Sequence, residues 1–218
     1  MPHPQPAGYL AQPSTGPGRP ILVLHAWWGL NEAIRVLCDR LAAEGFTAFA
    51  PDLYHGQVTD TLPGAEALSQ ALFADLSAPR GDLAQAAEYL DALTGQPSSG
   101  LAVIGFSLGA FFAFDLSIAL PERIRTVVTF YGTHPGGFAA SQAAYLCHFA
   151  EMDPFEPPEG VTELETTLRQ AGRPATFYHY PGTGHWFFEP DQEDAYDAVA
   201  AQLAWERTLA FLQSGPQG

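Results

Sequence analysis

The sequence predicts an α/β protein in which helices cover both faces of a mostly parallel sheet. Strand-like and helix-like segments alternate along almost the whole chain, and the strand-like segments are continuous apolar runs such as PILVLH at 20–25. A parallel sheet covered on both faces needs such runs, whereas a strand with one solvated face alternates apolar and polar residues. The length of 218 residues, 47% of them hydrophobic, suits one compact domain spanning 1–218.

The N-terminal half opens with a Pro- and Gly-rich segment, 1–19, which we expect to form an edge strand at 8–12 and a surface loop. The helix expected at 31–44 has the clearest pattern, because Asn31 can cap it, apolar residues follow the 3.6-residue period, and Gly45 ends it. The other elements expected in this half are strands at 20–25 and 46–52 and helices at 64–76 and 80–93.

The C-terminal half continues the alternation. An apolar strand at 101–106 leads through Ser107 into a helix, and the closing segment 191–212 is expected to be helical. The remaining expected elements are strands at 124–131, 145–150 and 175–180 and a helix at 163–171. No internal repeat or low-complexity linker marks a second domain.

The composition limits the partners and the compartment. A formal net charge of −15 argues against a nucleic acid or an anionic membrane as partner. No apolar stretch reaches membrane-spanning length, and the N-terminus lacks the pattern of a signal peptide. Cys38 and Cys147 are expected to be small buried hydrophobic residues in a reduced compartment. We therefore expect a cytoplasmic monomer or small homo-oligomer that acts on a small molecule.

The most informative motif is the pentapeptide Gly-Phe-Ser-Leu-Gly at 105–109. A strand, a serine flanked by glycines and a helix, in that order, are typical of a nucleophile elbow. Gly105 and Gly109 remove side chains that would clash in this tight turn, which leaves the Ser107 hydroxyl presented above the sheet edge. The motif predicts an α/β-hydrolase fold with Ser107 as the nucleophile.

A serine nucleophile needs a base, and the chain order of this fold places that base late in the sequence. His185 follows a strand in the loop PGTGHW, where a Gly-rich segment can fold it back over the sheet edge. His148 and His179 lie within strands, and we expect them to be packed core residues. His3, His55 and His134 lie in loops without a comparable setting.

The acid that orients the histidine is expected after a strand between Ser107 and His185. The segment after the strand near 145–150 reads Glu-Met-Asp-Pro-Phe-Glu, and Asp153 is well placed in it. Glu151 is the main alternative and Glu156 a weaker one. An exposed acidic loop without any such role is the simplest competing interpretation.

The oxyanion hole requires two backbone N–H donors. We expect one from Leu108, at the start of a helix, and one from Trp27, in the loop after the strand 20–25. His25 is expected to brace that loop. We expect an aromatic substrate wall of Trp27, Trp28, Phe106, Tyr131, Trp186 and Phe187, with ordinary core packing as the alternative for the two adjacent tryptophans.

Several segments together resemble the dienelactone hydrolase family. These are VLHAWWGLN, the run LAAEGFTAFAPDLY with its Pro51–Tyr54 segment, the GFSLG elbow, the Tyr131–Gly132 pair, Asp153 and the GTGH loop that ends at His185. The resemblance spans roughly 20–218. It implies a single-domain α/β hydrolase without a large cap, an open site and no cofactor.

The chain also departs from that family. The best-known dienelactone hydrolases use a cysteine nucleophile and a glutamate that handles the thiol proton, where this chain has Ser107 and Ala26. Their arginine four residues after the catalytic histidine, which binds a substrate carboxylate, corresponds to Glu189 here, and we expect Glu189 to repel a carboxylate. Arg80 is another basic residue, but we expect it to open a helix. The resemblance and these departures together predict hydrolysis of a neutral ester.

We therefore predict a serine esterase with the triad Ser107, His185 and Asp153, acting on a small neutral ester or lactone through an acyl-enzyme. The same fold could act on a C–C or peptide bond or carry out perhydrolysis. A non-catalytic small-molecule binding protein is the alternative from another class. The sequence shows no spacing typical of a metal site.

Overall fold

The computed structural model describes residues 4–95 and 100–215, and its seven strands form one sheet in the order β1-β3-β2-β4-β5-β6-β7. All neighbouring strands are parallel except β1, which pairs antiparallel with β3 at one edge. The strands are β1 (Gly8–Ala11), β2 (Arg19–Leu24), β3 (Phe46–Pro51), β4 (Leu101–Phe106), β5 (Ile124–Phe130), β6 (Ala144–Met152) and β7 (Ala175–Gly184).

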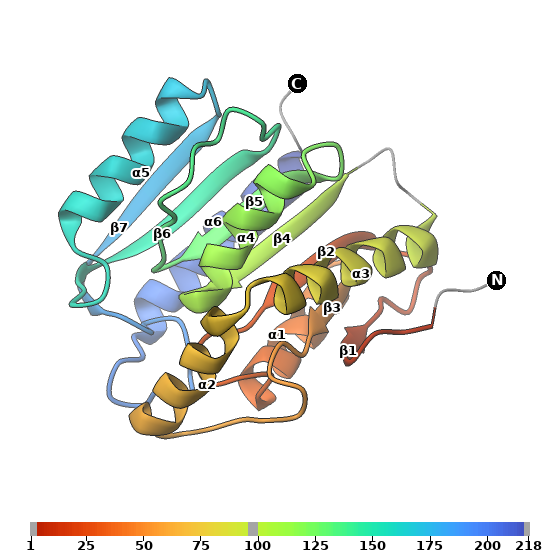
Figure 1. Cartoon of the computed structure of the whole chain (residues 1–218), viewed down its shortest axis with the longest axis horizontal. Coiled ribbons are helices and arrows are strands. Elements are labelled where there is room, and N and C mark those ends of the chain that lie inside the picture. Colours follow the sequence, from red (N-terminus) through yellow and green to blue (C-terminus); the bar gives the residue numbers. More distant parts are fainter. Residues whose placement is uncertain (1–3, 96–99, 216–218) are drawn as a thin grey trace.

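Helices pack on both faces of this sheet, as the continuous apolar strands predict (Figure 1). In β2, the side chains of Ile21 and Val23 join the core beneath α1 and α6, whereas Leu22 and Leu24 join the core beneath α3, α4 and α5. Successive side chains of a strand point to opposite faces, so both sets must be apolar. The helices are α1 (Glu32–Ala43), α2 (Leu62–Ala74), α3 (Ser77–Thr94), α4 (Leu108–Ala119), α5 (Pro158–Gln170) and α6 (Ala198–Ser214).

The strand order brings distant parts of the chain to one edge of the sheet. The chain places β3 on one side of β2 and then crosses to β4 on the other side. In open α/β sheets a binding crevice forms outside the carboxyl ends of the strands at such a reversal. The residues that follow β2, β4, β6 and β7 all lie at this edge.

The three largest differences from the sequence-based expectation lie at the starts of α5 and α6 and at the end of β7. Helix α5 begins at Pro158 rather than at residue 163, because proline fits the first turn of a helix, where its missing N–H is not needed. Helix α6 begins at Ala198 rather than at 191, because the Asp197 side chain accepts hydrogen bonds from the N–H groups of Val199 and Ala200. Strand β7 extends to Gly184, which pairs with Met152 of β6.

Of the two histidines that were expected in the core, His148 is buried and His179 is exposed. His148 is fully buried, with Nδ1 2.7 Å from the Tyr180 hydroxyl and Nε2 3.1 Å from the Thr208 hydroxyl. Burial lowers the pKa of His148 to about 3. The prediction for His179 was wrong, because β7 is an edge strand and leaves this side chain exposed. Cys38 and Cys147 are both buried and unpaired with each other, as predicted.

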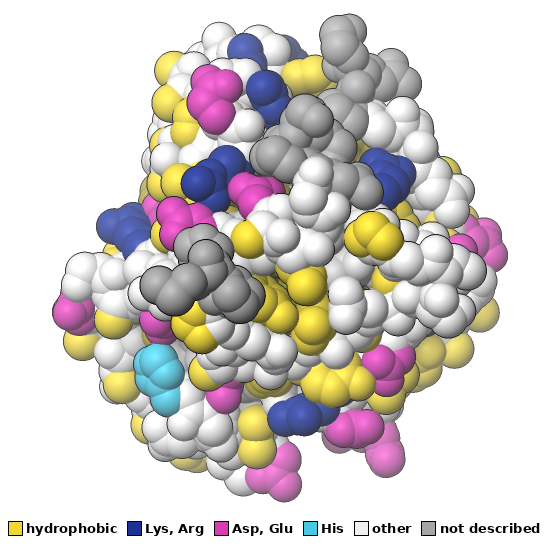
Figure 2. Space-filling model, turned by 90° about the vertical axis from the view of Figure 1, so that its right-hand side faces the viewer, with side chains coloured by type: hydrophobic (Ala, Val, Ile, Leu, Met, Phe, Trp, Pro, Cys, Tyr) yellow, Lys and Arg dark blue, Asp and Glu magenta, His cyan; other side chains and the backbone are white. Residues whose placement is uncertain are grey.

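On the face shown in Figure 2, arginine side chains lie interspersed with Asp and Glu rather than gathered into one basic patch. No helix of the described part of the chain is long and apolar enough to cross a membrane.

Candidate active site

Ser107 occupies a strained turn between β4 and α4. Its φ of +51° lies in a region that residues other than glycine rarely adopt. A Cβ at Gly105 would overlap the backbone of Gly109, and one at Gly109 would overlap the Leu24 carbonyl oxygen. Gly132 is equally restricted, since its Cβ would lie 2.6 Å from the Ala110 Cβ. Glycines therefore let β2, β4, β5 and α4 approach closely enough to hold Ser107 in this conformation.

The Ser107 hydroxyl, the His185 imidazole and the Asp153 carboxyl form a chain of two hydrogen bonds. His185 Nε2 lies 2.9 Å from Ser107 Oγ, and His185 Nδ1 lies 2.7 Å from Asp153 Oδ2. The side chains of His185 and Asp153 are only 4% and 2% exposed. Each of the three residues directly follows a parallel strand, namely β4, β6 and β7, whose carboxyl ends share one sheet edge.

The loop after β6 fixes the orientation of Asp153. Its Oδ1 atom accepts hydrogen bonds from the N–H groups of Phe155 (2.9 Å) and Glu156 (3.2 Å), which leaves Oδ2 for His185. Glu151 instead accepts a 2.8 Å bond from the Gly182 N–H. Of the three carboxylates considered from the sequence, only Asp153 contacts the imidazole.

This arrangement can transfer a proton from a hydroxyl to an imidazole. With Asp153 accepting from Nδ1–H, the His185 Nε2 atom is left to accept the Ser107 proton. The N–H groups of Leu108 and Trp27 donate no hydrogen bond to any residue that the structure describes. Leu108 is the first residue of α4, where the helix dipole favours a negative charge.

A cavity of about 270 Å³ opens over the Ser107 hydroxyl. It is lined by Trp27, Phe73, Ser107, Leu108, Phe111, Thr133, Phe155, Glu156, His185 and Trp186. The wall is mostly aromatic, as predicted, but its composition differs from the expected one. Trp27 and Trp186 line the cavity, while Trp28, Phe106, Tyr131 and Phe187 do not.

These four residues belong to the core because of their places in the sheet and its loops. Trp28 is 3% exposed and packs 5.3 Å from Trp186, behind the cavity wall. Phe106, the last residue of β4, faces α1 and α6. Tyr131 and Phe187 are fully buried beneath the loop that carries His185.

Four further lining residues were not predicted from the sequence, namely Phe73, Phe111, Thr133 and Phe155, and Glu156 was predicted only as a possible acid partner of the histidine. Phe155 had a signal, because it lies two residues after Asp153 in a loop at the sheet edge, and its ring is 4.9 Å from the His185 ring. Phe73 and Phe111 lie on helices α2 and α4 with ring centroids 5.3 Å apart. Nothing in their local sequence separates them from core residues.

Glu189 does not line this cavity. Its buried carboxyl accepts a 2.7 Å hydrogen bond from the Tyr131 hydroxyl, on the other side of the His185 loop. Burial raises the pKa of Glu189 to about 8. The expectation that Glu189 would repel a substrate carboxylate is therefore not supported by its position. Arg80, in the first turn of α3, donates hydrogen bonds of 2.8 and 2.7 Å to the carboxylate of Asp115 on α4. Arg80 does not line the cavity either.

His25 braces the loop that carries Trp27. Its Nε2 accepts a 3.3 Å hydrogen bond from the Leu53 N–H, and its Nδ1 lies 2.8 Å from the Ala26 carbonyl oxygen. Burial lowers the pKa of His25, which keeps the ring neutral. Both ring nitrogens of His25 then have a hydrogen-bond partner, and the loop after β2 is tied to Leu53 in the loop after β3.

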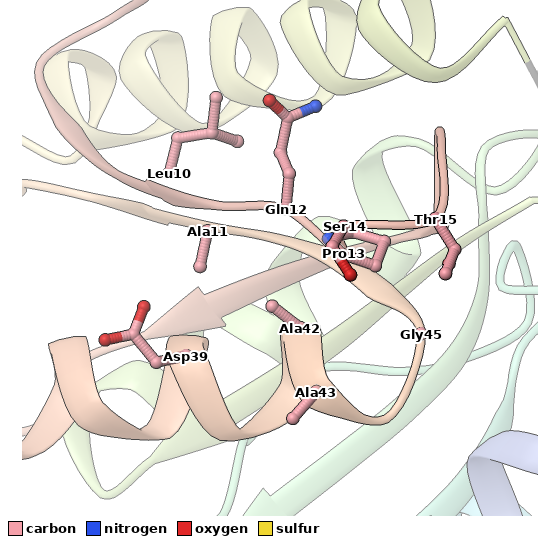
Figure 3. Close-up of a pocket in the computed structure, with 10 residues that line it drawn as sticks. All are labelled: Leu10, Ala11, Gln12, Pro13, Ser14, Thr15, Asp39, Ala42, Ala43 and Gly45. Atoms are coloured by element: carbon pink, nitrogen blue, oxygen red, sulfur yellow. The ribbon is translucent and has the colours of Figure 1, made fainter.

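A larger hollow of about 500 Å³ lies elsewhere, between the segment after β1 and the last turns of α1 (Figure 3). Asp39 is its one ionisable side chain, and it accepts a 2.9 Å bond from the Tyr9 hydroxyl. Neither Ser107 nor His185 lines this hollow. No group of three or more His, Cys, Asp or Glu residues suited to a metal ion occurs among the described residues.

Comparisons with known proteins agree with the fold. The model of the dienelactone hydrolase family matches residues 7–215. A protein of Aquifex aeolicus named "Putative carboxymethylenebutenolidase" is 30% identical over 95% of this chain and 92% of its own length. A Bradyrhizobium protein named "Probable 2-oxo-3-(5-oxofuran-2-ylidene)propanoate lactonase" is 29% identical over 94% of this chain and 88% of its own.

A solved structure also supports the assignment of the fold. A crystal structure titled as a "Putative Dienelactone Hydrolase" from Klebsiella pneumoniae superimposes with a TM-score of 0.82 at 26% identity, covering 94% of this chain and 91% of that one. The region that the family model matches, residues 7–215, includes β1 to α6. The chain belongs to the dienelactone hydrolase family of α/β hydrolases.

Proposed function

We propose that the protein is a serine hydrolase that cleaves a small carboxylic ester or lactone without a negative charge. In this mechanism His185 takes the proton of Ser107 while Ser107 Oγ attacks the carbonyl carbon. The N–H groups of Leu108 and Trp27 stabilise the oxyanion, and the alcohol leaves with a proton from His185. Water, activated by His185, then releases the acid from the acyl-enzyme, and Asp153 stays ionised throughout.

The observation that carries this proposal is the hydrogen-bonded chain from Ser107 through His185 to Asp153, with the serine held at φ +51°. A hydroxyl becomes a useful nucleophile only when a base lies within hydrogen-bond distance. The strained turn is maintained by close backbone contacts, so a conformation that costs stability is retained where it serves the nucleophile. The lactonase name of the Bradyrhizobium relative supports including cyclic esters.

The test is labelling with a fluorophosphonate followed by mass spectrometry, together with hydrolysis of p-nitrophenyl acetate. We expect one adduct, on Ser107, and esterase activity that Ser107→Ala abolishes. Absence of both from a protein with a cooperative thermal transition would overturn the proposal and favour a non-catalytic binding protein.

A further inference from the structure

The cavity over Ser107 combines aromatic walls with one carboxyl group. Five of its lining residues are Trp or Phe, and they come from the loop after β2, from α2, from α4 and from the loops after β6 and β7: Trp27, Phe73, Phe111, Phe155 and Trp186. Several of these rings contact one another. The ring centroid of Phe155 lies 5.7 Å from that of Trp27 and 5.3 Å from that of Trp186. The face of an aromatic ring carries negative charge density and attracts a cation.

Glu156 is the only acidic residue among the described lining residues. Its side chain is half-buried, and its N–H is tied to Asp153 Oδ1 at 3.2 Å, which fixes the loop on which it stands. Burial raises the pKa of Glu156 to about 7, hydrogen bonding to Thr133 opposes this rise, and the charge of Asp153 adds to it. A carboxyl group that is costly to ionise in an aromatic cavity is stabilised when a cation enters beside it.

Among the described lining residues of the cavity there is no Lys or Arg to oppose a cation. All nine Lys and Arg residues of the chain are arginines, and none lines the cavity. Each contacts another group: acidic side chains for Arg80, Arg123, Arg125 and Arg169, aromatic rings for Arg19, Arg35, Arg40 and Arg207, and a backbone carbonyl for Arg173. A substrate carboxylate would therefore find no partner here, whereas an ammonium group would find several.

We propose that the substrate class is an ester that carries an ammonium group, held by Glu156 and the aromatic rings while its carbonyl lies over Ser107. This inference rests on the proposed hydrolase function and adds a specificity determinant to it. The cation contacts Glu156 and the ring faces of Trp27 and Phe155. The cavity volume of about 270 Å³ limits the substrate to a small ester.

A matched pair of esters isolates the charge. The first, 2-(trimethylammonio)ethyl acetate, and the second, 3,3-dimethylbutyl acetate, have nearly the same shape and the same acyl group, but only the first is charged. We expect wild-type protein to hydrolyse the cationic ester with about tenfold higher kcat/KM at pH 8, measured by proton NMR. Equal rates, or a preference for the neutral ester, would overturn the proposal.

The pH dependence of this preference separates Glu156 from the catalytic groups. The ratio of the two kcat/KM values cancels any effect of pH on the catalytic step that both esters share. Asp153 and His185 are the titratable groups that face Glu156, while His134, on the loop of Thr133, faces Asp115 at 3.8 Å. We expect the ratio to fall about threefold or more between pH 8 and pH 5.5 as Glu156 gains a proton.

Glu156→Gln removes the charge while keeping the shape. We expect this variant to show a lower ratio of the two kcat/KM values, and that ratio should no longer change with pH. The control is Glu159→Gln, which removes the same charge from an exposed position three residues away and should leave the ratio unchanged. An equal effect of both substitutions would assign the preference to the overall negative charge instead of to Glu156.

Binding without turnover keeps the inference testable if the hydrolase proposal fails. Benzyltrimethylammonium should bind Ser107→Ala protein in calorimetry, and Glu156→Gln in that background should weaken binding about fivefold or more. Failure of both esters with retained ammonium binding would reject the hydrolase function but keep the cation site. Hydrolysis of both esters at equal rates without ammonium binding would reject the cation site alone.

Discussion

The Tyr131 hydroxyl donates a 2.7 Å hydrogen bond to the buried carboxyl of Glu189, behind the imidazole that faces Ser107. The Tyr131 ring lies 4.8 Å from the His185 ring, so this pair supports the base from its buried side. Burial is the main cause that raises the pKa of Glu189 to about 8, and the charge of Asp191 adds to it, while the bond from Tyr131 lowers it. The neutral carboxyl is thus the form that fits this environment.

Glu189→Gln should make the protein less sensitive to rising pH. The unfolded chain ionises Glu189 near its ordinary pKa of 4.5, whereas the folded protein does so near 8, so wild-type stability falls as pH rises through this interval. Glutamine does not titrate. The quantity to compare is the Tm of the variant minus the Tm of the wild type. We expect this difference to be larger at pH 8 than at pH 5 by roughly 5 °C or more in differential scanning calorimetry.

The control for this measurement is Glu193→Gln, a nearby exposed residue whose Tm difference from wild type should not change with pH. A constant difference for Glu189→Gln across the same interval would show that its carboxyl is already ionised in the folded protein.

Asp153→Asn should reduce kcat for p-nitrophenyl acetate by about 10³-fold or more, because the amide no longer holds His185 in the tautomer that accepts the Ser107 proton. Glu151→Gln, two residues away, should keep kcat within about twofold, since its carboxyl contacts only the Gly182 N–H. Steady-state kinetics on both variants makes the comparison. Similar losses in the two would remove Asp153 from the proposed mechanism.

Phe155→Ala and Trp28→Ala should separate the cavity wall from the core. Phe155 is 45% exposed, so its loss should lower kcat/KM several-fold with little change in Tm. Trp28 is 3% exposed, and its truncation should cost about 3–5 kcal/mol of stability. Denaturant unfolding and ester kinetics on each variant provide the test, and a reversal of the two effects would contradict the assignment of Trp28 to the core.

Gly81→Ala should stabilise the protein by about 0.5–1 kcal/mol, because Gly81 lies inside α3 with open space where a Cβ would stand. Gly45→Ala offers the contrast. Its Cβ would also meet open space, but a φ of +89° disfavours any L side chain there, so we expect destabilisation of about 1 kcal/mol. Urea unfolding of the pair measures both signs, and two changes of the same sign would refute the argument from backbone conformation.

Local sequence patterns were sufficient to predict the structure of a short segment where steric constraints allow that segment only one conformation. The run of apolar residues before Gly105 and the glycines on either side of Ser107 predict a tight strand-to-helix turn, because other residues there would collide with neighbouring backbone. Asn31 and Gly45 likewise mark the two ends of α1, with the Asn31 side chain accepting from the Ile34 N–H at 3.2 Å.

Residue type alone did not separate cavity wall from core. Trp27 and Trp28 are adjacent and identical, yet one lines the cavity and the other is buried, because the turn after β2 points them in different directions. Phe73 lines the cavity from α2, where its ring packs against Phe111 and Phe112 of α4. Glu189 was expected to repel a substrate carboxylate, but its side chain is hydrogen-bonded to Tyr131 and does not line the cavity.

By itself, the sequence determined the class of fold, the strained serine turn and the histidine loop, since each depends on steric and hydrophobic rules that act over a few residues. The tertiary structure alone decided which carboxylate meets His185, which aromatic rings surround Ser107, and that Glu156 enters the same cavity. Those relationships join residues from β2, β4, β6, β7 and two helices. Their distances follow from strand order and helix packing, which no local segment encodes.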